Sequence, residues 1–326
     1  MKTKERVLNI LYGRQEPVSG EEIAATLGIS RNSVWKAINS LKSQGYGVSA
    51  TSHGYMLENS KEFDEYAIKR YLKREHCLHL YKKETSSNTV AKALCQGGAI
   101  HGTVVVVESQ TAGRGRMGRS FLSSSENGLY MSLVLRPKIS ADKCVNITAA
   151  TAVAVADAIE KTSGVHTGIK WVNDVYVGEK KCAGILTEAS IDFESGSVQY
   201  VIVGIGVNLC PPEGGFDKEI EEIACGVYEN GYPQGYKARL CAEIVNNLFD
   251  LYDGLESKNY MAKYRKKSII IGKAVDVYVG DSVVTGVAMD IDENANLVVM
   301  DSQGIPHTFN SGEARVRKTN DKRGIV

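Results

Sequence analysis

The sequence lacks a charge excess, since 39 Lys and Arg face 38 Asp and Glu and the formal net charge is +1. This balance gives no reason to expect the chain as a whole to bind nucleic acid or an anionic membrane, so any basic surface must be local. Closely spaced cysteine pairs are also missing. The seven cysteines are odd in number and form no Cys-x-x-Cys, which fits reduced thiols in a cytoplasmic protein better than a disulfide framework or a zinc site.

Long apolar runs and internal repeats are absent as well. The first residues lead directly into a helical pattern with no apolar stretch behind them, so neither a signal peptide nor a membrane-spanning helix is expected. We expect a soluble, cytoplasmic protein with no membrane partner. With 326 residues the chain is long enough for two or three domains.

The N-terminal residues follow the plan of a winged helix-turn-helix. A first helix carries Val7, Leu8 and Leu11 on one face, a second over 21–27 ends at Gly28, and a third begins after an N-cap serine. A hairpin predicted over residues 48–57 would be the wing. The alternative is a small helical domain for protein contacts.

Polar and basic residues at the start and on the outer face of the third helix favour the reading of a DNA major groove. The residues expected to contact DNA are Ser30, Arg31, Asn32, Ser33, Lys36 and Asn39.

After a polar linker, the chain changes to an alternation of apolar strands and helices, which predicts an α/β (α+β) domain. Strands are expected over 103–108, 129–135, 168–171 and 201–207, and helices over 145–161 and 236–255. The last segment, over 272–318, holds short alternating strands with turns between them, and this pattern predicts a small β-barrel.

Residues 110–119 contain three glycines and three arginines. Gly113, Gly115 and Gly118 match the dinucleotide fingerprint Gly-x-Gly-x-x-Gly, but that fingerprint requires a helix directly afterwards and an acidic residue about 20 positions further on. A turn-like cluster and a strand follow instead. We therefore predict a loop whose arginines clamp an anion, because guanidinium groups suit phosphate and carboxylate. The alternative is an ordinary solvated loop.

Two other segments have residues suited to ligand contacts. Lys181 immediately precedes an apolar strand, where its ammonium could point into a cleft and stabilise negative charge, although a lysine at a hairpin end is more often only solubilising. Gly204 and Gly206 interrupt a buried strand. Glycine there is often kept where a ligand lies against the backbone, and a β-bulge is the alternative.

Together with Ser86-Ser87-Asn88, these segments resemble the biotin–protein ligases, and more closely the bifunctional bacterial form that also represses the biotin biosynthesis operon. The matched motifs are Gly-Arg-Gly-Arg-x-Gly-Arg at 113–119, Lys-Trp-Pro-Asn-Asp at 170–174 with Val172 in place of proline, Lys-x-Ala-Gly-Ile-Leu at 181–186 and Gly-x-Gly-x-Asn at 204–208. The resemblance covers essentially the whole chain.

Three positions depart from the family pattern. Serine replaces threonine in the Ser-Thr-Asn signature, which keeps the hydroxyl, and Ser87-Asn88-Thr89 is an alternative register. A tryptophan common soon after the arginine loop is Phe121 here, and the third departure is Val172.

The resemblance implies three domains: a winged helix-turn-helix DNA-binding domain over 1–62, an α/β (α+β) catalytic domain over 63–268 and a small SH3-like β-barrel over 269–326. It implies an ATP-dependent ligase that first forms biotinyl-5′-adenylate and then transfers biotin to a lysine of the carrier domain of a biotin-dependent carboxylase.

The resemblance also implies roles for individual residues. The catalytic residues would be Lys181, Arg114 and Arg116. Biotin would be bound by Ser86, Ser87, Asn88, Gln110, Arg114, Gly115, Arg116, Lys181, Gly204 and Gly206. The nucleotide would be bound by Arg116, Arg119, Trp171, Asn173, Asp174 and Asn208, with Asp174 as the candidate ligand for Mg²⁺.

As a repressor, such a protein would use biotinyl-5′-AMP as its corepressor and would bind operator DNA as a homodimer. Two alternatives remain open: a ligand-sensing DNA-binding repressor without ligase activity, and a ligase of the lipoate type, because lipoate ligases share the catalytic fold. The intact arginines and lysine disfavour the first alternative, and the winged helix and arginine loop disfavour the second.

Overall fold

The computed structural model describes residues 2–12, 14, 16–59, 63–123, 127–192, 194 and 196–317. It divides into two compact units, Met1–Arg70 and Tyr71–Val326, which are described separately below. Within the described residues, no helix combines the length and the apolar composition needed to cross a bilayer.

The first unit has the elements predicted for a winged helix-turn-helix: α1 (Thr3–Leu11), α2 (Gly20–Leu27), α3 (Arg31–Ser43), the hairpin β1 (Gly47–Thr51) and β2 (Gly54–Asn59), and a short α4 (Glu65–Lys69). The turn between the helices was correctly predicted. Gly28 ends α2 in the left-handed region (φ 65°), and the Ser30 hydroxyl caps α3 by accepting from the backbone N–H of Ser33.

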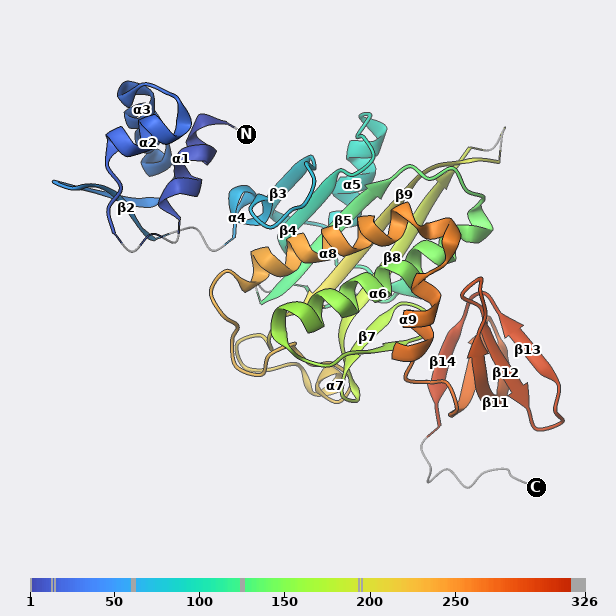
Figure 1. Ribbon diagram of the computed structural model, residues 1–326. Helices are drawn as coiled ribbons and strands as arrows, with labels where there is room; N and C mark the ends of the chain where they lie inside the picture. Colours follow the sequence, from blue (N-terminus) through green and yellow to red (C-terminus); the bar gives the residue numbers. More distant parts are fainter. Residues whose placement is uncertain are drawn as a thin grey trace. The chain divides into compact units, whose positions relative to one another are not determined.

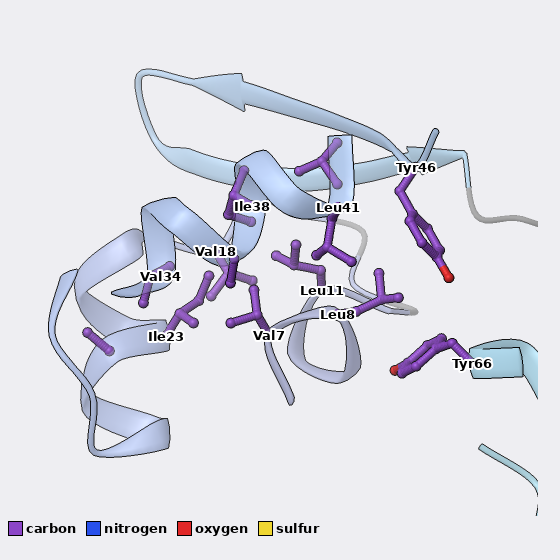
Figure 2. Packing of buried hydrophobic residues seen from close by; sticks show 13 residues of the cluster. Val7, Leu8, Leu11, Val18, Ile23, Val34, Ile38, Leu41, Tyr46 and Tyr66 are labelled. Atoms are coloured by element: carbon purple, nitrogen blue, oxygen red, sulfur yellow. The ribbon is translucent and has the colours of Figure 1, made fainter. Parts of the chain in front are cut away.

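The helices of this unit bury their apolar faces in one common core. Figure 2 shows Leu8 and Leu11 of α1 near Leu41 of α3, with Val18 beside Ile38 in the same cluster. All five side chains are almost fully buried. The outer face of α3 is therefore left for polar contacts, because a helix of this length has one apolar stripe only.

The second unit is built on a seven-stranded sheet in the order β3-β4-β5-β9-β8-β7-β6. Among the described strands of this sheet, β3 and β4 are the one pair that runs parallel. The strand bounds are Leu78–Glu84 (β3), Val104–Gln110 (β4), Gly128–Leu135 (β5), Gly168–Lys170 (β6), Asp174–Val177 (β7), Lys180–Ile191 (β8) and Val198–Asn208 (β9). All eight residues of β5 are buried, which shows that both faces of the sheet centre are covered.

Helices cover the two faces unequally. α5 (Ser87–Gln96) packs against β4, β5 and β9, on the face towards which Gly204 and Gly206 are directed. α6 (Cys144–Ser163) packs on the opposite face, and α8 (Tyr236–Asp253) lies beside it (Figure 1). The remaining helices are α7 (Lys218–Glu221), α9 (Tyr260–Lys267) and the 3-10 turns η1 (Arg116–Gly118), η2 (Ala141–Lys143) and η3 (Leu255–Ser257).

The C-terminal strands form a separate five-stranded antiparallel sheet in the order β13-β12-β11-β10-β14 (Figure 1). Their bounds are Ala274–Val279 (β10), Ser282–Ile291 (β11), Leu297–Asp301 (β12), Pro306–Phe309 (β13) and Glu313–Val316 (β14). The predicted barrel is not confirmed, because the edge strands β13 and β14 do not pair in the described part of the chain. Each is only four residues long, and β13 begins with a proline that has no N–H to donate.

Candidate functional site

One cavity gathers the residues assigned to biotin binding. It lies on the α5 side of the sheet, between β8, β9, the start of α5 and the arginine loop. All ten predicted residues line it: Ser86, Ser87, Asn88, Gln110, Arg114, Gly115, Arg116, Lys181, Gly204 and Gly206. The wall is completed by Phe121, Asn173 and residues 184–186 and 205. Segments up to 120 residues apart in the sequence therefore meet at this point.

A buried hydrogen-bond network holds the polar residues of the cavity in place. The backbone N–H of Ser87 donates to Gln110 Oε1 (2.7 Å), and the Ser132 hydroxyl lies 2.7 Å from Ser87 Oγ and 2.6 Å from Asn88 Oδ1. Asn88 Nδ2 donates to Glu188 Oε2 (2.6 Å). The partners of Asn88 and Gln110 determine which end of each side-chain amide is the oxygen and which is the nitrogen. Each amide therefore has one defined orientation.

The two strand glycines leave space that side chains of the protein fill. A Cβ on Gly204 would lie 2.2 Å from Asn88 Oδ1, and a Cβ on Gly206 would lie 2.6 Å from the Phe121 ring. The phenyl ring also approaches Gly184. The cavity between these groups is small, about 50 Å³. Larger residues at either glycine would displace the side chains that shape it.

Each arginine of the loop has a partner in the second unit. Arg114 donates to Glu188 Oε2 (3.0 Å). Arg116 donates to Asn173 Oδ1 (2.8 Å) and to the carbonyl of Gly312 (3.3 Å). Arg119 forms an ion pair with Glu313. The contacts of Arg116 and Arg119 tie the loop to the beginning of β14.

These contacts shift the ionisation of the groups involved. Hydrogen bonding to Arg119 and Arg315 lowers the pKa of Glu313 to about 2, against the opposing effect of its burial. Burial lowers the pKa of the Arg116 guanidinium from its ordinary value, while the charge of Asp174 acts in the other direction. Arg116 is thus a desolvated cation whose charge is held by nearby carboxylates.

Lys181 stands at the cavity wall beside a carboxylate. Its ammonium lies 2.7 Å from Asp174 Oδ1 across the β7–β8 hairpin. Asn173 Nδ2 donates to the same carboxylate oxygen (2.9 Å) and to the carbonyl of Ile185 (3.0 Å). Lys181 is one of the residues that line the cavity, and the catalytic role expected for it stays a prediction.

The residues assigned to the nucleotide are less closely grouped. Arg116 and Asn173 line the cavity, and Asp174 contacts it through Lys181. Trp171 is buried and its indole donates to the carbonyl of Ala295, towards the C-terminal sheet. Arg119 faces Glu313, and Asn208 is paired within the sheet with Gly128. The roles of these residues stay predictions.

Sequence reasoning missed Phe121, which lines the cavity, and Ser132 and Glu188, which hydrogen-bond to lining residues. Ser132 lies in the middle of an apolar strand, Glu188 lies beyond the Ala-Gly-Ile-Leu segment, and Phe121 was noted only as a departure from the family pattern. A hydroxyl inside a fully buried run was the one available signal for Ser132, because buried polar groups are normally hydrogen-bonded.

The predicted DNA-contacting residues lie together at the start and on the outer side of α3. Ser30, Arg31, Asn32, Lys36 and Asn39 are exposed, and Ser33 is half-buried. Trp35 of the same helix is 55% exposed, which is unusual for an aromatic side chain and was not predicted. Within the described residues, no group of three or more His, Cys, Asp or Glu side chains is arranged to hold a metal ion.

The chain was compared with known protein families, curated proteins and solved structures, and two family patterns match it. The pattern of the biotin/lipoate A/B protein ligase family matches residues 81–208, and that of an HTH domain matches residues 3–56. The bifunctional ligase/repressor BirA of Bacillus subtilis is 41% identical over 214 residues, 64% of this chain and 65% of the relative. The match thus spans just under two thirds of the length of that relative.

Two further similarities extend this result. The biotin–[acetyl-CoA-carboxylase] ligase of Mycobacterium tuberculosis is 30% identical over 65% of this chain and 78% of the relative. The solved structure of the biotin protein ligase from Aquifex aeolicus in complex with biotin and ATP is 26% identical, with a TM-score of 0.60, and covers 74% of this chain and 99% of that chain.

Proposed function

Because the chain belongs to the biotin/lipoate A/B protein ligase family, we propose that it activates biotin with ATP and transfers it to a lysine of a biotin carrier domain. The observation that carries this proposal is the gathering of all ten expected biotin-contacting residues around one cavity. The names of similar proteins, which include biotin protein ligases and a structure with biotin and ATP, support the same substrates.

In the proposed reaction, biotin's ureido group meets the amide and hydroxyl groups of the buried network. Ser87, Asn88 and Gln110 supply both donors and acceptors. A carboxylate oxygen of biotin then attacks the α-phosphorus of ATP, the bond to the pyrophosphate oxygen breaks, and pyrophosphate leaves with the electron pair. The product is the mixed anhydride biotinyl-5′-AMP.

Charge stabilisation would accelerate this step. Lys181 and Arg116 line the same cavity, so both cations can face the negative charge that develops between carboxylate and phosphate. Arg114 would neutralise biotin's carboxylate on approach. None of these residues forms a covalent bond to the substrate, so the rate enhancement would come from positioning and electrostatics.

Magnesium would enter with the nucleotide rather than occupy a site made by the protein. Asp174 is a carboxylate beside Lys181 at the cavity wall, and it is engaged by Lys181 and Asn173. A magnesium ion bound to ATP phosphates needs only one or two protein carboxylates, and this residue could supply one.

The HTH domain supports a second role as a repressor, as the name of the Bacillus relative says of that protein. We propose that α3 reads operator DNA, that biotinyl-5′-AMP is the corepressor and that a homodimer contacts both halves of a palindrome. We also propose that the C-terminal sheet corresponds to an SH3-like barrel whose β14 segment supports the arginine loop.

Biotin-dependent exchange of pyrophosphate into ATP tests the enzyme. We expect exchange with biotin and none with lipoate. A folded protein that binds biotin without exchange would be a sensor only, and exchange with lipoate alone would reassign the substrate.

A further inference from the structure

A second cavity, of about 160 Å³, lies on the other face of the sheet. It is bounded by the first turns of α6, by the outer half of β8 and by Asn310, which lies between β13 and β14. Thr148 of α6 and Thr187 of β8 face each other in its wall, with their hydroxyl oxygens 2.8 Å apart. None of the residues assigned above to biotin, except Arg116, belongs to this lining.

The lining combines exposed and buried residues. Ala189 and Asn310 are exposed and form the outer end. Thr148, Val172 and Ile185 are buried at the inner end, with exposures of 8%, 4% and 2%. The cavity is therefore a passage that leads from the protein surface into the interior.

The inner end adjoins the first cavity. Arg116 and Ile185 line both cavities. The two cavities lie close to each other where the sheet becomes narrower. β7 pairs with β8 as far as Gly184, and after Gly184 the described part of β8 has β9 as its one neighbouring strand. A side chain that entered from the surface would arrive at Arg116, the residue expected to face the activated carboxyl group.

The chemistry of the lining suits an uncharged amine on an aliphatic chain. Four of the nine lining residues are aliphatic, two threonine hydroxyls face each other, and Cys144 adds a thiol. Arg116 is the one charged side chain among the lining residues. Two nearby carboxylates, those of Asp174 and Glu313, are not among the lining residues. Asp174 forms an ion pair with Lys181, and Glu313 forms one with Arg119. A cation at the end of a weakly polar passage favours the neutral form of an amine.

We propose that this passage admits the side chain of the acceptor lysine of the carrier domain. The inference rests on the proposed ligase function and adds the route of its second substrate. In the step, the lone pair of the lysine nitrogen attacks the anhydride carbonyl carbon and a C–N bond forms. The carbonyl C–O bond to phosphate breaks, AMP leaves with the electron pair, and one amine proton passes to solvent.

Narrowing the outer end tests the route. Ala189→Phe places a ring at the exposed mouth, and Ser190→Phe, the next residue on β8 and outside the lining, is the matched control. Pyrophosphate exchange reports adenylation. Transfer of label from biotinyl-5′-AMP to a purified carrier domain, and to hydroxylamine as a small acceptor, reports the second step.

We expect Ala189→Phe to lower kcat/KM for the carrier domain by at least about tenfold, because small misplacements of a reacting group are costly. Exchange and capture by hydroxylamine should stay within about twofold of wild type, and Ser190→Phe should transfer normally. Normal carrier transfer by Ala189→Phe would overturn the proposal. A rise in KM for ATP in the exchange assay would also overturn it and assign the passage to the nucleotide. Absence of exchange in the wild type would instead refute the ligase function.

A second variant tests the charge argument without changing the width of the passage. Asn310→Asp adds a carboxylate at the mouth that would hold the lysine as its ammonium. We expect the pH profile of carrier transfer to move to higher pH, while the profile of pyrophosphate exchange stays unchanged. An unchanged transfer profile would mean that the amine does not pass Asn310, and the proposal would fail.

Discussion

The replacement of Gly204 by alanine offers the sharpest test of how the buried network shapes the biotin cavity. The new Cβ would lie 2.2 Å from Asn88 Oδ1, whereas ordinary contact begins at 3.4 Å, so the amide must move by about 1 Å. Asn88 is held on both sides, by Ser132 at 2.6 Å and by Glu188 at 2.6 Å. Such a movement breaks or weakens both hydrogen bonds.

The expected cost follows from those two bonds. A buried neutral bond contributes about 1 kcal/mol and one to a charged group about 1.5–3 kcal/mol, which together give a loss of about 2–4 kcal/mol. The loss can appear as a lower free energy of unfolding, as weaker biotin binding, or as both. If all of it appears in binding, the Kd for biotin rises by about 30- to 1000-fold.

Urea unfolding and titration calorimetry with biotin measure the two parts. Gly206→Ala is the matched control on the same strand and face, where the new Cβ meets the ring of Phe121, a loop side chain that can rotate away. We expect the control to lose less than about 1 kcal/mol in the free energy of unfolding. A combined loss below about 1 kcal/mol for Gly204→Ala would refute the argument that Asn88 is fixed by its two partners.

Three other predictions follow from the site and the helix. Lys181→Ala should lower biotin-dependent pyrophosphate exchange by about 10² or more with little change in biotin affinity. Lys180→Ala, the control, should leave exchange unchanged. Near-normal exchange in Lys181→Ala would mean that another residue stabilises the charge of the adenylation step. Replacing Arg31 and Lys36 together by alanine should abolish operator binding in an anisotropy assay and leave ligation intact, and a joint loss of both activities would contradict the division into domains. Because the pKa of Glu313 is lowered from 4.5 to about 2, its stabilisation is present above pH 4.5 and is lost as the pH falls towards 2. The difference in unfolding free energy between wild type and Glu313→Gln should therefore shrink across this range, and a constant difference would exclude the ion pair as its source.

Local signals predicted the HTH elements well. Gly28 and Ser30 have defined conformational roles at the end of one helix and the beginning of the next, and both roles depend on neighbouring residues only. The central strands were also predictable, because apolar runs of this length must be buried.

Contacts between distant segments could not be predicted in the same way. Arg119 and Glu313 are 194 positions apart, and no local pattern assigns them to each other. The indole N–H of Trp171 donates to the carbonyl of Ala295, in the turn between β11 and β12, and no local pattern predicts a contact across 124 positions. The C-terminal strands were recognised individually, while closure into a barrel depends on the pairing of edge strands, which their composition does not determine.

The partners of the loop arginines have a consequence for the thermodynamics of ligand binding. If the proposed acyl-adenylate binds Arg114 and Arg119, it takes them from Glu188 and Glu313, and binding is then an exchange of counter-anions. The pairs being exchanged are partly exposed and each is worth only about 0–1 kcal/mol, so the loop gives them up at low cost. The number of ion pairs is nearly conserved in such an exchange, and the affinity for the adenylate should depend less on ionic strength than the number of arginines alone suggests.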